Sequence, residues 1–240
     1  MHTRKVYLYV FDTMSDWEVG YLIAELNSGR YFKKELAPLE VVVVGVDKNP
    51  VTTMGGLKIL PSISIDECIL ENTDVLVLPG GNTWTEAIHE PLLNKASASL
   101  KEGTVVAAIC GATVGLAKMG LLNSRRHTSN SLEYMKMICP NYTGDKYYEM
   151  EPAVTEGNLV TASGIAPLEF TMHVLKVLDV FAPETLHSWF NLYQTHEPKY
   201  FFELMNSIKF TESTGGGTGP LYPARTREMF RVIDDDLDFP

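Results

Sequence analysis

The chain has 240 residues, of which 45% are hydrophobic, and a formal net charge of −10. This length and apolar content predict one substantial core, within a single α/β domain over residues 1–210, and exclude a disordered chain. The acidic balance argues against nucleic acid and against an anionic membrane as partners. Three cysteines without a C-x-x-C pair do not make a disulfide framework, and no signal peptide precedes the first strand, so a cytoplasmic protein is expected.

The first half of the chain alternates predicted strands and helices. Strands are expected over residues 6–11, 39–46 and 75–78, and apolar periodicity predicts a helix through 19–26 that ends at Gly29. Gly55-Gly56 indicates a hairpin between residues 51–53 and 58–60. A helical region over 84–100 is interrupted at Pro91. This βαβ spacing predicts a parallel sheet with helices on both faces.

The second half continues with a helix over residues 131–138, a hairpin of 154–155 and 159–162, and helices over 168–180 and 183–193. The adjacent aromatic rings of residues 200–202 are expected to pack on the core or on a second subunit. Residues 211–240 are expected to form a Gly-rich linker and an acidic C-terminal tail, to which we assign no chemistry.

A reactive cysteine is predicted at the centre of the chain. Residues 104–109 are a run of small and β-branched apolar side chains, typical of a strand buried on both faces, and Cys110 follows at once. Gly111 and Ala112 allow a sharp turn into a helix. The strand, the turn and the helix together make a nucleophile elbow, with cysteine in the position that serine usually occupies. The helix N-terminus would lower the thiol pKa and its N–H groups would hold an oxyanion. The alternative is a buried apolar cysteine at a strand end.

Three stretches should meet Cys110, because the carboxyl ends of parallel strands share one edge of the sheet. Gly80-Gly81 lets the backbone pass close to a ligand. Ser15-x-x-Glu18 has the spacing of a capping box, which locally explains Glu18 better than a role beside the thiol. Of six histidines, His127 lies in a polar loop that could fold over Cys110 as a base. No metal or nucleotide motif is present, so neither a metal nor a cofactor is predicted.

Four motifs in this order resemble the ThiJ/PfpI superfamily, which includes the parkinsonism-associated deglycase, PfpI-type proteases and uncharacterised bacterial members. The resemblance covers residues 6–180, and it implies a three-layer sandwich with a mostly parallel, flavodoxin-like sheet. The motifs are Asp16-Trp17-Glu18, Leu78-Pro79-Gly80-Gly81, Ala107-Ala108-Ile109-Cys110-Gly111 and Thr161-Ala162-Ser163-Gly164.

The resemblance also implies roles for particular residues. Cys110 matches the nucleophile, and Glu18 matches the acid beside the thiol, which reverses the local preference for a cap. His127 matches a histidine near the cysteine of the deglycase-like branch. The backbone N–H groups of Gly81 and Gly111, with Gly80 beside them, would form the oxyanion site, and the candidates for the substrate pocket are Trp17, Trp84 and Asn130. Members of the family are usually homodimers.

The predicted function is that of a cysteine-dependent enzyme acting on a small carbonyl or acyl compound, in the manner of a glyoxalase or deglycase. Gly111 stands where PfpI-type proteases carry histidine, and Pro167-Leu168-Glu169 lacks the histidine of a glutaminase triad, so both activities are disfavoured. An amidotransferase-like or small-amide hydrolase reaction is the alternative. A redox-sensing or chaperone-like stress protein without turnover is the alternative from another class.

Overall fold

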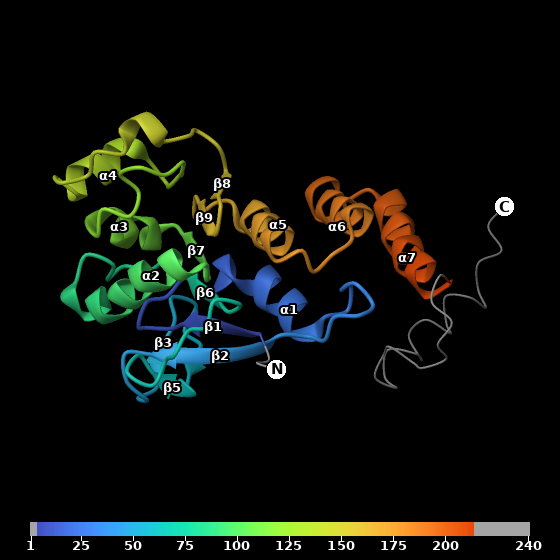
Figure 1. Cartoon of the computed structure of the whole chain (residues 1–240), viewed down its shortest axis with the longest axis horizontal. Helices are drawn as coiled ribbons and strands as arrows, with labels where there is room; N and C mark the ends of the chain where they lie inside the picture. The colour runs from blue at the N-terminus through green and yellow to red at the C-terminus, as the bar shows by residue number, and fades with distance from the viewer. Residues whose placement is uncertain (1–3, 214–240) are drawn as a thin grey trace.

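The structure, a computed structural model, describes residues 4–213 and is built around a seven-stranded sheet (Figure 1). The five central strands are parallel. When these five are numbered among themselves in chain order, they follow the flavodoxin-like order 2-1-3-4-5, which confirms the predicted sheet. A parallel strand extends one edge and an antiparallel strand the other. From edge to edge the strands are β5 (Ile63–Ser64), β2 (Glu40–Gly45), β1 (Lys5–Tyr9), β6 (Val75–Leu78), β7 (Val105–Ile109), β9 (Leu159–Ala162) and β8 (Ala153–Glu156).

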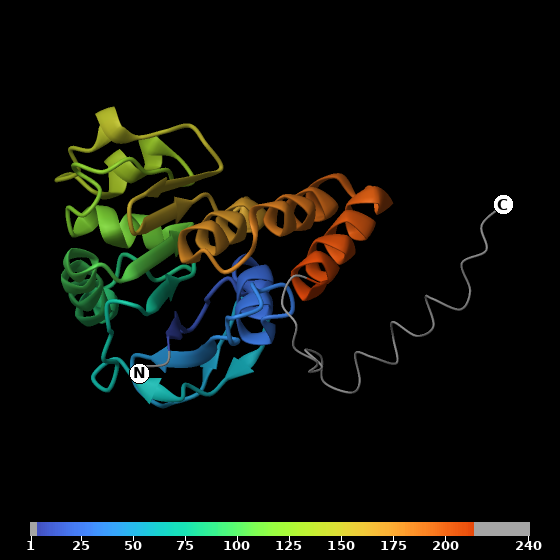
Figure 2. The same cartoon turned by 45° about the vertical axis from the view of Figure 1, so that its right-hand side comes forward.

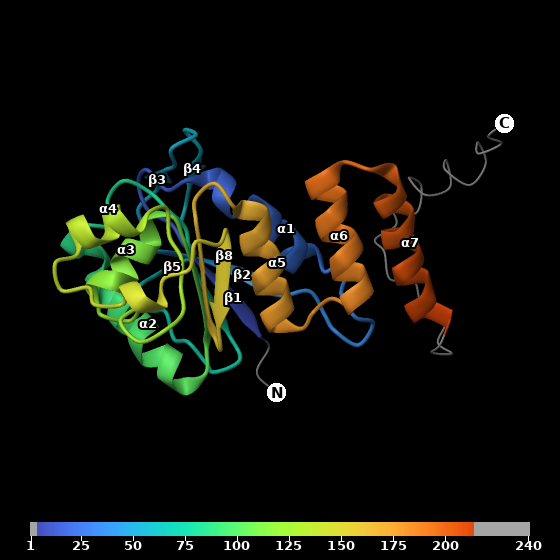
Figure 3. The same ribbon diagram turned by 90° about the horizontal axis from the view of Figure 1, so that it is seen from above.

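Helices cover both faces of this sheet, so the fold has three layers (Figure 3). The helices α1 (Gly20–Ser28) and α5 (Pro167–Leu178) lie on one face, and α2 (Glu90–Glu102) and α3 (Gly111–Lys118) lie on the other. Every residue of β6 and β7 is buried, as expected of strands covered on both sides. The short helix α4 (Leu132–Ile138) packs on α3.

Two further helices extend the layer that contains α5 (Figure 2). The helix α6 (Pro183–Thr195) packs on α5, and α7 (Pro198–Ser213) packs on α6. In the aromatic run at 200–202, Tyr200 and Phe201 are half-buried and Phe202 is exposed. Because α7 continues to Ser213, residues 211–213 are helical and do not begin a linker as predicted. The remainder of that predicted segment, 214–240, lies outside the described residues.

Local structure departs from the sequence expectations at few places. Pro91 lies in the first turn of α2. The N–H groups of a first turn have no partner within the helix, so the proline, which lacks an N–H, costs no hydrogen bond there and does not interrupt the helix. Gly29 ends α1 in the left-handed conformation, as predicted. The hairpin of β3 (Val51–Thr52) and β4 (Lys58–Ile59) is confirmed, and 3-10 turns are found at Asp16–Glu18, Ala87–His89 and Asp145–Tyr147. No helix within residues 4–213 is long and apolar enough to cross a membrane.

A buried ion pair joins α1 to the added helices. The Glu25 carboxylate is buried on α1, and it accepts hydrogen bonds from Nε and Nη2 of Arg30. The indole Nε1 of Trp189, on α6, donates to the same carboxylate at 3.0 Å. Glu25 is therefore satisfied from two sides, and the α6–α7 pair is held to the sheet domain by a polar contact within an apolar layer.

Replacing Arg30 by alanine is expected to lower the free energy of unfolding by about 2 to 3 kcal/mol, because the Glu25 carboxylate stays buried without its cation. Urea denaturation followed by circular dichroism measures this change. The matched control is Lys48→Ala, which breaks the exposed Lys48–Glu67 pair and should change stability by less than about 1 kcal/mol. Equal losses in the two variants would contradict the structural role of the buried pair.

Candidate active site

The nucleophile elbow is formed as the sequence predicts. Cys110 connects β7 directly to α3 and has φ 59° and ψ −126°, a conformation that a non-glycine residue adopts only at a strained turn. A Cβ on Gly111 would stand 2.9 Å from both the Gly81 carbonyl oxygen and Cδ1 of Trp84. Only glycine fits at position 111, so the sharp turn after Cys110 requires Gly111.

Glu18 faces the cysteine from the 3-10 turn that follows β1. Its side chain is completely buried, and the backbone N–H of Gly80 donates to Oε2 at 2.6 Å. Oε1 has no hydrogen bond of good geometry among the described residues. A Cβ placed on Gly164 would lie 3.0 Å from Oε1 and 2.7 Å from the Cys110 sulfur, so both atoms border the same small space.

The capping box therefore does not form. The Ser15 side chain makes no capping hydrogen bond, and its backbone N–H donates to the Gly80 carbonyl oxygen at 2.9 Å. The Ser-x-x-Glu spacing instead sets the loop after β1 against the loop after β6, with Glu18 turned inward. The local preference for a cap was wrong, because a tertiary contact replaced the local one.

Glu18 and Cys110 form a coupled acid pair. Burial raises the pKa of the Glu18 carboxyl group. Burial, and then the charge of an ionised Glu18, raise the pKa of the Cys110 thiol to about 11. The Gly111 N–H at the start of α3 acts to lower the thiol pKa, as expected of a helix N-terminus, but burial and the Glu18 charge outweigh it. Two buried acids side by side keep at least one proton between them at neutral pH, and the pair titrates as a unit.

Asn130 contacts the nucleophile itself. Its Nδ2 donates to the Cys110 sulfur at 3.2 Å, while its Oδ1 accepts from the Gly164 N–H at 2.7 Å and from the Ser163 hydroxyl at 3.3 Å. The Ser131 side chain caps α4 by accepting from the Tyr134 N–H, which fixes the loop that carries Asn130. Asn130 was predicted to line a substrate pocket, which stays a prediction; its side chain lines a groove and also donates to the sulfur.

His127 is not directed at the cysteine, and its predicted role as a base is corrected. The ring is buried, with Nδ1 2.6 Å from the Arg125 carbonyl oxygen and Nε2 2.6 Å from the Tyr142 hydroxyl. Burial lowers the pKa of His127, which favours the neutral ring. The carbonyl requires a proton on Nδ1, and Nε2 then accepts from Tyr142, so both nitrogens are engaged within their own loop.

The Gly80-Gly81 turn and Trp84 brace the elbow. The Gly80 N–H is used by Glu18, so it does not serve an oxyanion. The other two N–H groups of the predicted oxyanion site belong to Gly81 and Gly111, and the backbones of these two residues lie against each other. Trp84 is buried, and its Nε1 donates to the Pro79 carbonyl oxygen at 2.8 Å. Trp84 is therefore a support beneath the elbow, and its predicted place in a substrate pocket is wrong.

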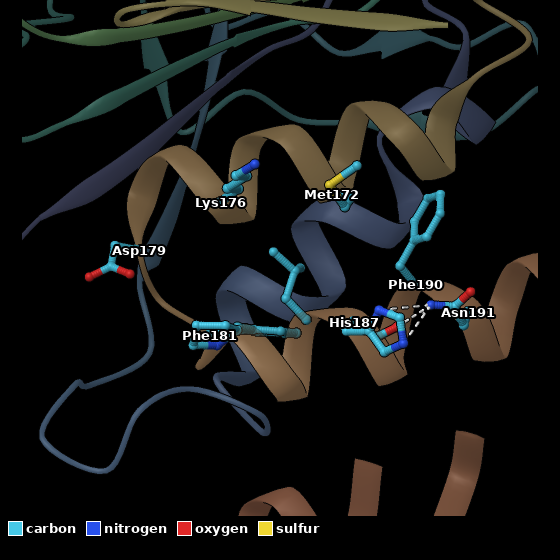
Figure 4. A pocket seen from close by; sticks show the side chains of 9 residues that line it. Met172, Lys176, Asp179, Phe181, His187, Phe190 and Asn191 are labelled. Atoms are coloured by element: carbon cyan, nitrogen blue, oxygen red, sulfur yellow. Dashed lines mark hydrogen bonds between the residues drawn. The ribbon is translucent and has the colours of Figure 1, made fainter. Parts of the chain in front are cut away.

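Asn130 and Ser163 form part of the wall of a groove of about 390 Å³, and Asn130 connects this groove to Cys110, which is not itself in the lining. Trp17, adjacent to Glu18, is 53% exposed, and its place in a substrate pocket stays a prediction. A hollow of about 580 Å³ lies between α5 and α6 (Figure 4). Its wall contains Met172, Phe181 and Phe190 but no predicted site residue. The hollow with the greater volume of the two is therefore not the one that Asn130 lines.

Gly164 and Ser163 are site residues that the sequence did not single out as such. They follow β9, which pairs with β7 and therefore ends beside the elbow. The available signal was the Thr161–Gly164 motif after a predicted strand, in line with the rule that sites form at carboxyl strand ends.

Replacing Gly164 by alanine is expected to displace the sulfur, because the new Cβ would stand 2.7 Å from Sγ and 2.9 Å from the Cys110 Cβ. We expect at least about a tenfold loss in the rate of Cys110 alkylation with little change in stability. Iodoacetamide labelling followed by mass spectrometry measures the rate. Gly20→Ala is the control for a substitution at an exposed glycine with open space around it and no positive φ. Unchanged labelling in Gly164→Ala would show that the sulfur does not need this space.

Comparisons with known proteins identify a family for the chain. Residues 4–177 match the model of the DJ-1/PfpI family. The chain is 67% identical over 208 residues to the "Uncharacterized protease YoaZ" of Bacillus subtilis, covering 87% of this chain and 99% of that protein. It is 22% identical over 151 residues to the "Glutathione-independent glyoxalase DJR-1.2" of Caenorhabditis elegans, covering 62% and 78%.

Solved structures show the same likeness. The thiJ/pfpI family protein of Bacillus anthracis superposes with a TM-score of 0.85 at 67% identity, covering 87% of this chain and 98% of that one. A DJ-1 superfamily protein of Agrobacterium tumefaciens superposes with a TM-score of 0.68 at 32% identity, covering 80% and 98%.

Proposed function

This chain belongs to the DJ-1/PfpI family, and from that premise we propose that it is a cysteine-dependent enzyme that converts a small α-oxoaldehyde into a 2-hydroxy acid. Cys110 is the nucleophile and Glu18 the group that moves protons. The observation that carries the proposal is the buried pair itself: a carboxyl group held by one oxygen on Gly80, with the other oxygen toward the sulfur.

The donors around the sulfur support a thiolate in the resting enzyme. Sγ receives the Asn130 amide at 3.2 Å, and the Gly111 N–H acts on it in the same direction, lowering the thiol pKa. If Glu18 holds the proton of the pair, the second of the two causes that raise the Cys110 pKa, repulsion by the Glu18 charge, disappears, and burial alone still raises it. The Glu18 hydroxyl then becomes a further donor to sulfur, and its Oε1 gains the partner it lacks.

The steps balance with these two residues and water. The Cys110 thiolate adds to the aldehyde carbon, forming a C–S bond, and the carbonyl oxygen takes the Glu18 proton. Glu18, now a carboxylate, removes the hydrogen from that carbon, and the electron pair moves toward the neighbouring carbonyl to give an enediolate. Glu18 returns this proton to the second carbon, and the hydroxyl proton of the first carbon moves to the oxygen of the second, which gives the thioester of a 2-hydroxy acid. Water hydrolyses the thioester, the hydroxy acid leaves, and the thiol proton passes to Glu18, which restores the thiolate and the protonated carboxyl group.

The same site favours peptide cleavage less, although the relative YoaZ carries the name of a protease. Peptide hydrolysis requires a proton donor for the leaving amine, which cysteine proteases supply from an imidazole beside the nucleophile. Here Gly111 follows the cysteine, and both nitrogens of His127 are engaged elsewhere.

A second candidate, a peroxide sensor without turnover, is favoured by one observation. A thiolate oxidised by peroxide to the sulfinic acid would place an oxygen near Oε1 of Glu18, where no partner now stands. Mass spectrometry after mild peroxide treatment should then show sulfinic acid at Cys110 and not at the buried Cys68 or Cys139.

The experiment that tests the leading proposal is incubation of the protein with methylglyoxal and measurement of lactate by NMR. A fluorogenic peptide is assayed in parallel. We expect lactate and no peptide cleavage. Absence of lactate from a protein whose Cys110 still reacts with iodoacetamide would overturn the proposed reaction and leave the activated thiol in place.

A further inference from the structure

The groove beside Cys110 has a one-sided charge. Three carboxylates line it, Glu133, Glu151 and Glu169, and they come from three different segments: α4, the loop before β8, and the first turn of α5. No lysine, arginine or histidine is part of this lining among the described residues. Of the nearby cations, Arg126 binds Glu149, and Lys136 lies 3.7 Å from Asp145 while its charge also acts on Glu133.

The groove also presents apolar side chains to solvent. Ile165 is 95% exposed and Met150 is 89% exposed, and both are part of the lining. Ile165 directly follows Gly164, whose Cα borders the Cys110 sulfur, so the chain connects this apolar surface to the nucleophile within one residue. Large aliphatic groups left this open beside a reactive centre are suited to contact the apolar part of a ligand.

From this arrangement we infer that the groove selects electrophiles that carry a positive charge on an aliphatic stem and disfavours anionic ones. The inference rests on the proposed function, since it names the substrate class of the same cysteine. An aminoalkyl compound would place its reactive carbon at Sγ, its stem along Ile165 and Met150, and its ammonium group among the three carboxylates. A carboxylate or phosphate in the same position would meet like charges without a compensating cation.

The test uses three thiol reagents of similar size that differ in charge, so it requires no knowledge of the reaction. These are the trimethylammonioethyl, 3,3-dimethylbutyl and sulfonatoethyl methanethiosulfonates. In each case the Cys110 thiolate attacks the sulfenyl sulfur, a new S–S bond forms, and methanesulfinate leaves. Second-order rate constants are measured by mass spectrometry at low ionic strength, and the Cys110→Ala protein corrects for reaction at Cys68 and Cys139.

We expect the ratio of cationic to anionic rate constants to exceed that of N-acetylcysteinamide by at least about tenfold, and to fall with added salt. Glu133→Gln, Glu151→Gln and Glu169→Gln combined should lower the ratio by about fivefold or more. The matched control, Glu71→Gln, Glu102→Gln and Glu203→Gln, removes the same net charge from exposed positions. Two of these precede β6 and β7, at the edge of the sheet opposite to the site. It should change the ratio less than about twofold.

The outcomes separate the two claims. Fast reaction with the neutral reagent and a charge ratio equal to that of the free thiol would overturn the charge selectivity and leave the activated cysteine intact. Equal changes in the groove triple variant and the control triple variant would also overturn it, since net charge would then be the cause. Slow reaction with all three reagents would overturn both claims, because the thiol would not be activated.

Discussion

Replacing Cys110 by serine is expected to lower kcat/KM for methylglyoxal by at least about a thousandfold. Serine keeps the shape of the elbow, but its hydroxyl ionises far less readily than a thiol and Glu18 is not a base strong enough to replace that difference. The measurement is lactate formation under saturating and sub-saturating substrate. Stability should be nearly unchanged, because the substitution removes no packing atom from the core.

The controls for this variant are within the chain. Cys68→Ser and Cys139→Ser replace buried thiols that border no reactive group, so they should retain turnover in whatever fraction remains folded. If Cys110→Ser retained the wild-type rate, cysteine catalysis would be refuted. The lactate would then have to come from another group or from the uncatalysed reaction.

Replacing Glu18 by glutamine is expected to lower turnover by about a hundred- to a thousandfold and to leave alkylation of Cys110 close to the wild-type rate. The amide still donates to the sulfur but cannot exchange a proton with the substrate, and general acid–base steps contribute factors of this size. Turnover and the pH dependence of iodoacetamide labelling are measured on the same protein. Glu25→Gln, also a buried glutamate on the neighbouring helix but remote from the sulfur, is the matched control.

The sign of the change in thiol pKa identifies where the pair keeps its proton. If Glu18 is protonated at rest, exchanging it for glutamine removes a good donor, and the apparent pKa of Cys110 should rise by about one unit or less. If Glu18 is ionised, the exchange removes the negative charge that raises the Cys110 pKa, so the apparent pKa should fall. A fall would contradict the thiolate that we propose for the resting enzyme.

Stability should respond to the same substitution in a defined range of pH. Burial raises the folded-state pKa of Glu18, so the folded protein binds this proton more tightly than the unfolded chain, whose pKa is about 4.3. The stabilising contribution is complete below about pH 4 and is lost as the pH rises toward the folded-state pKa. Glu18→Gln should therefore gain stability over wild type as the pH rises from about 4 toward the folded-state pKa of Glu18. A difference that is independent of pH would show that Glu18 is not perturbed.

Most of the fold could be predicted because its elements are long and periodic. The buried strands at β1, β6 and β7 are uninterrupted apolar runs, and Gly29 ends α1 as its position suggests. The two-residue strand β5 could not be predicted, since it exists through its pairing with β2 and has no pattern of its own. The homodimer and the cytoplasmic location remain predictions.

The site was predictable where local sequence and chemistry agree, and not where distant loops meet. Cys110 is marked by its strand, its turn and its helix. Glu18 satisfies a local capping pattern, so only its tertiary contact with Gly80 reveals its orientation. His127 and Asn130 lie three residues apart in one loop, and which of them reaches the sulfur depends on how that loop crosses β9. Sequence spacing does not contain that information.

The positive φ of Cys110 and the unpartnered oxygen of Glu18 have a consequence for how the chain tolerates random mutation. A library selected for folding alone should enrich glycine at position 110 and glutamine at position 18, because both relieve a local penalty. A library selected for turnover should reject the same two changes. The positions at which the two selections disagree would outline the working surface of the enzyme without any assumption about its substrate.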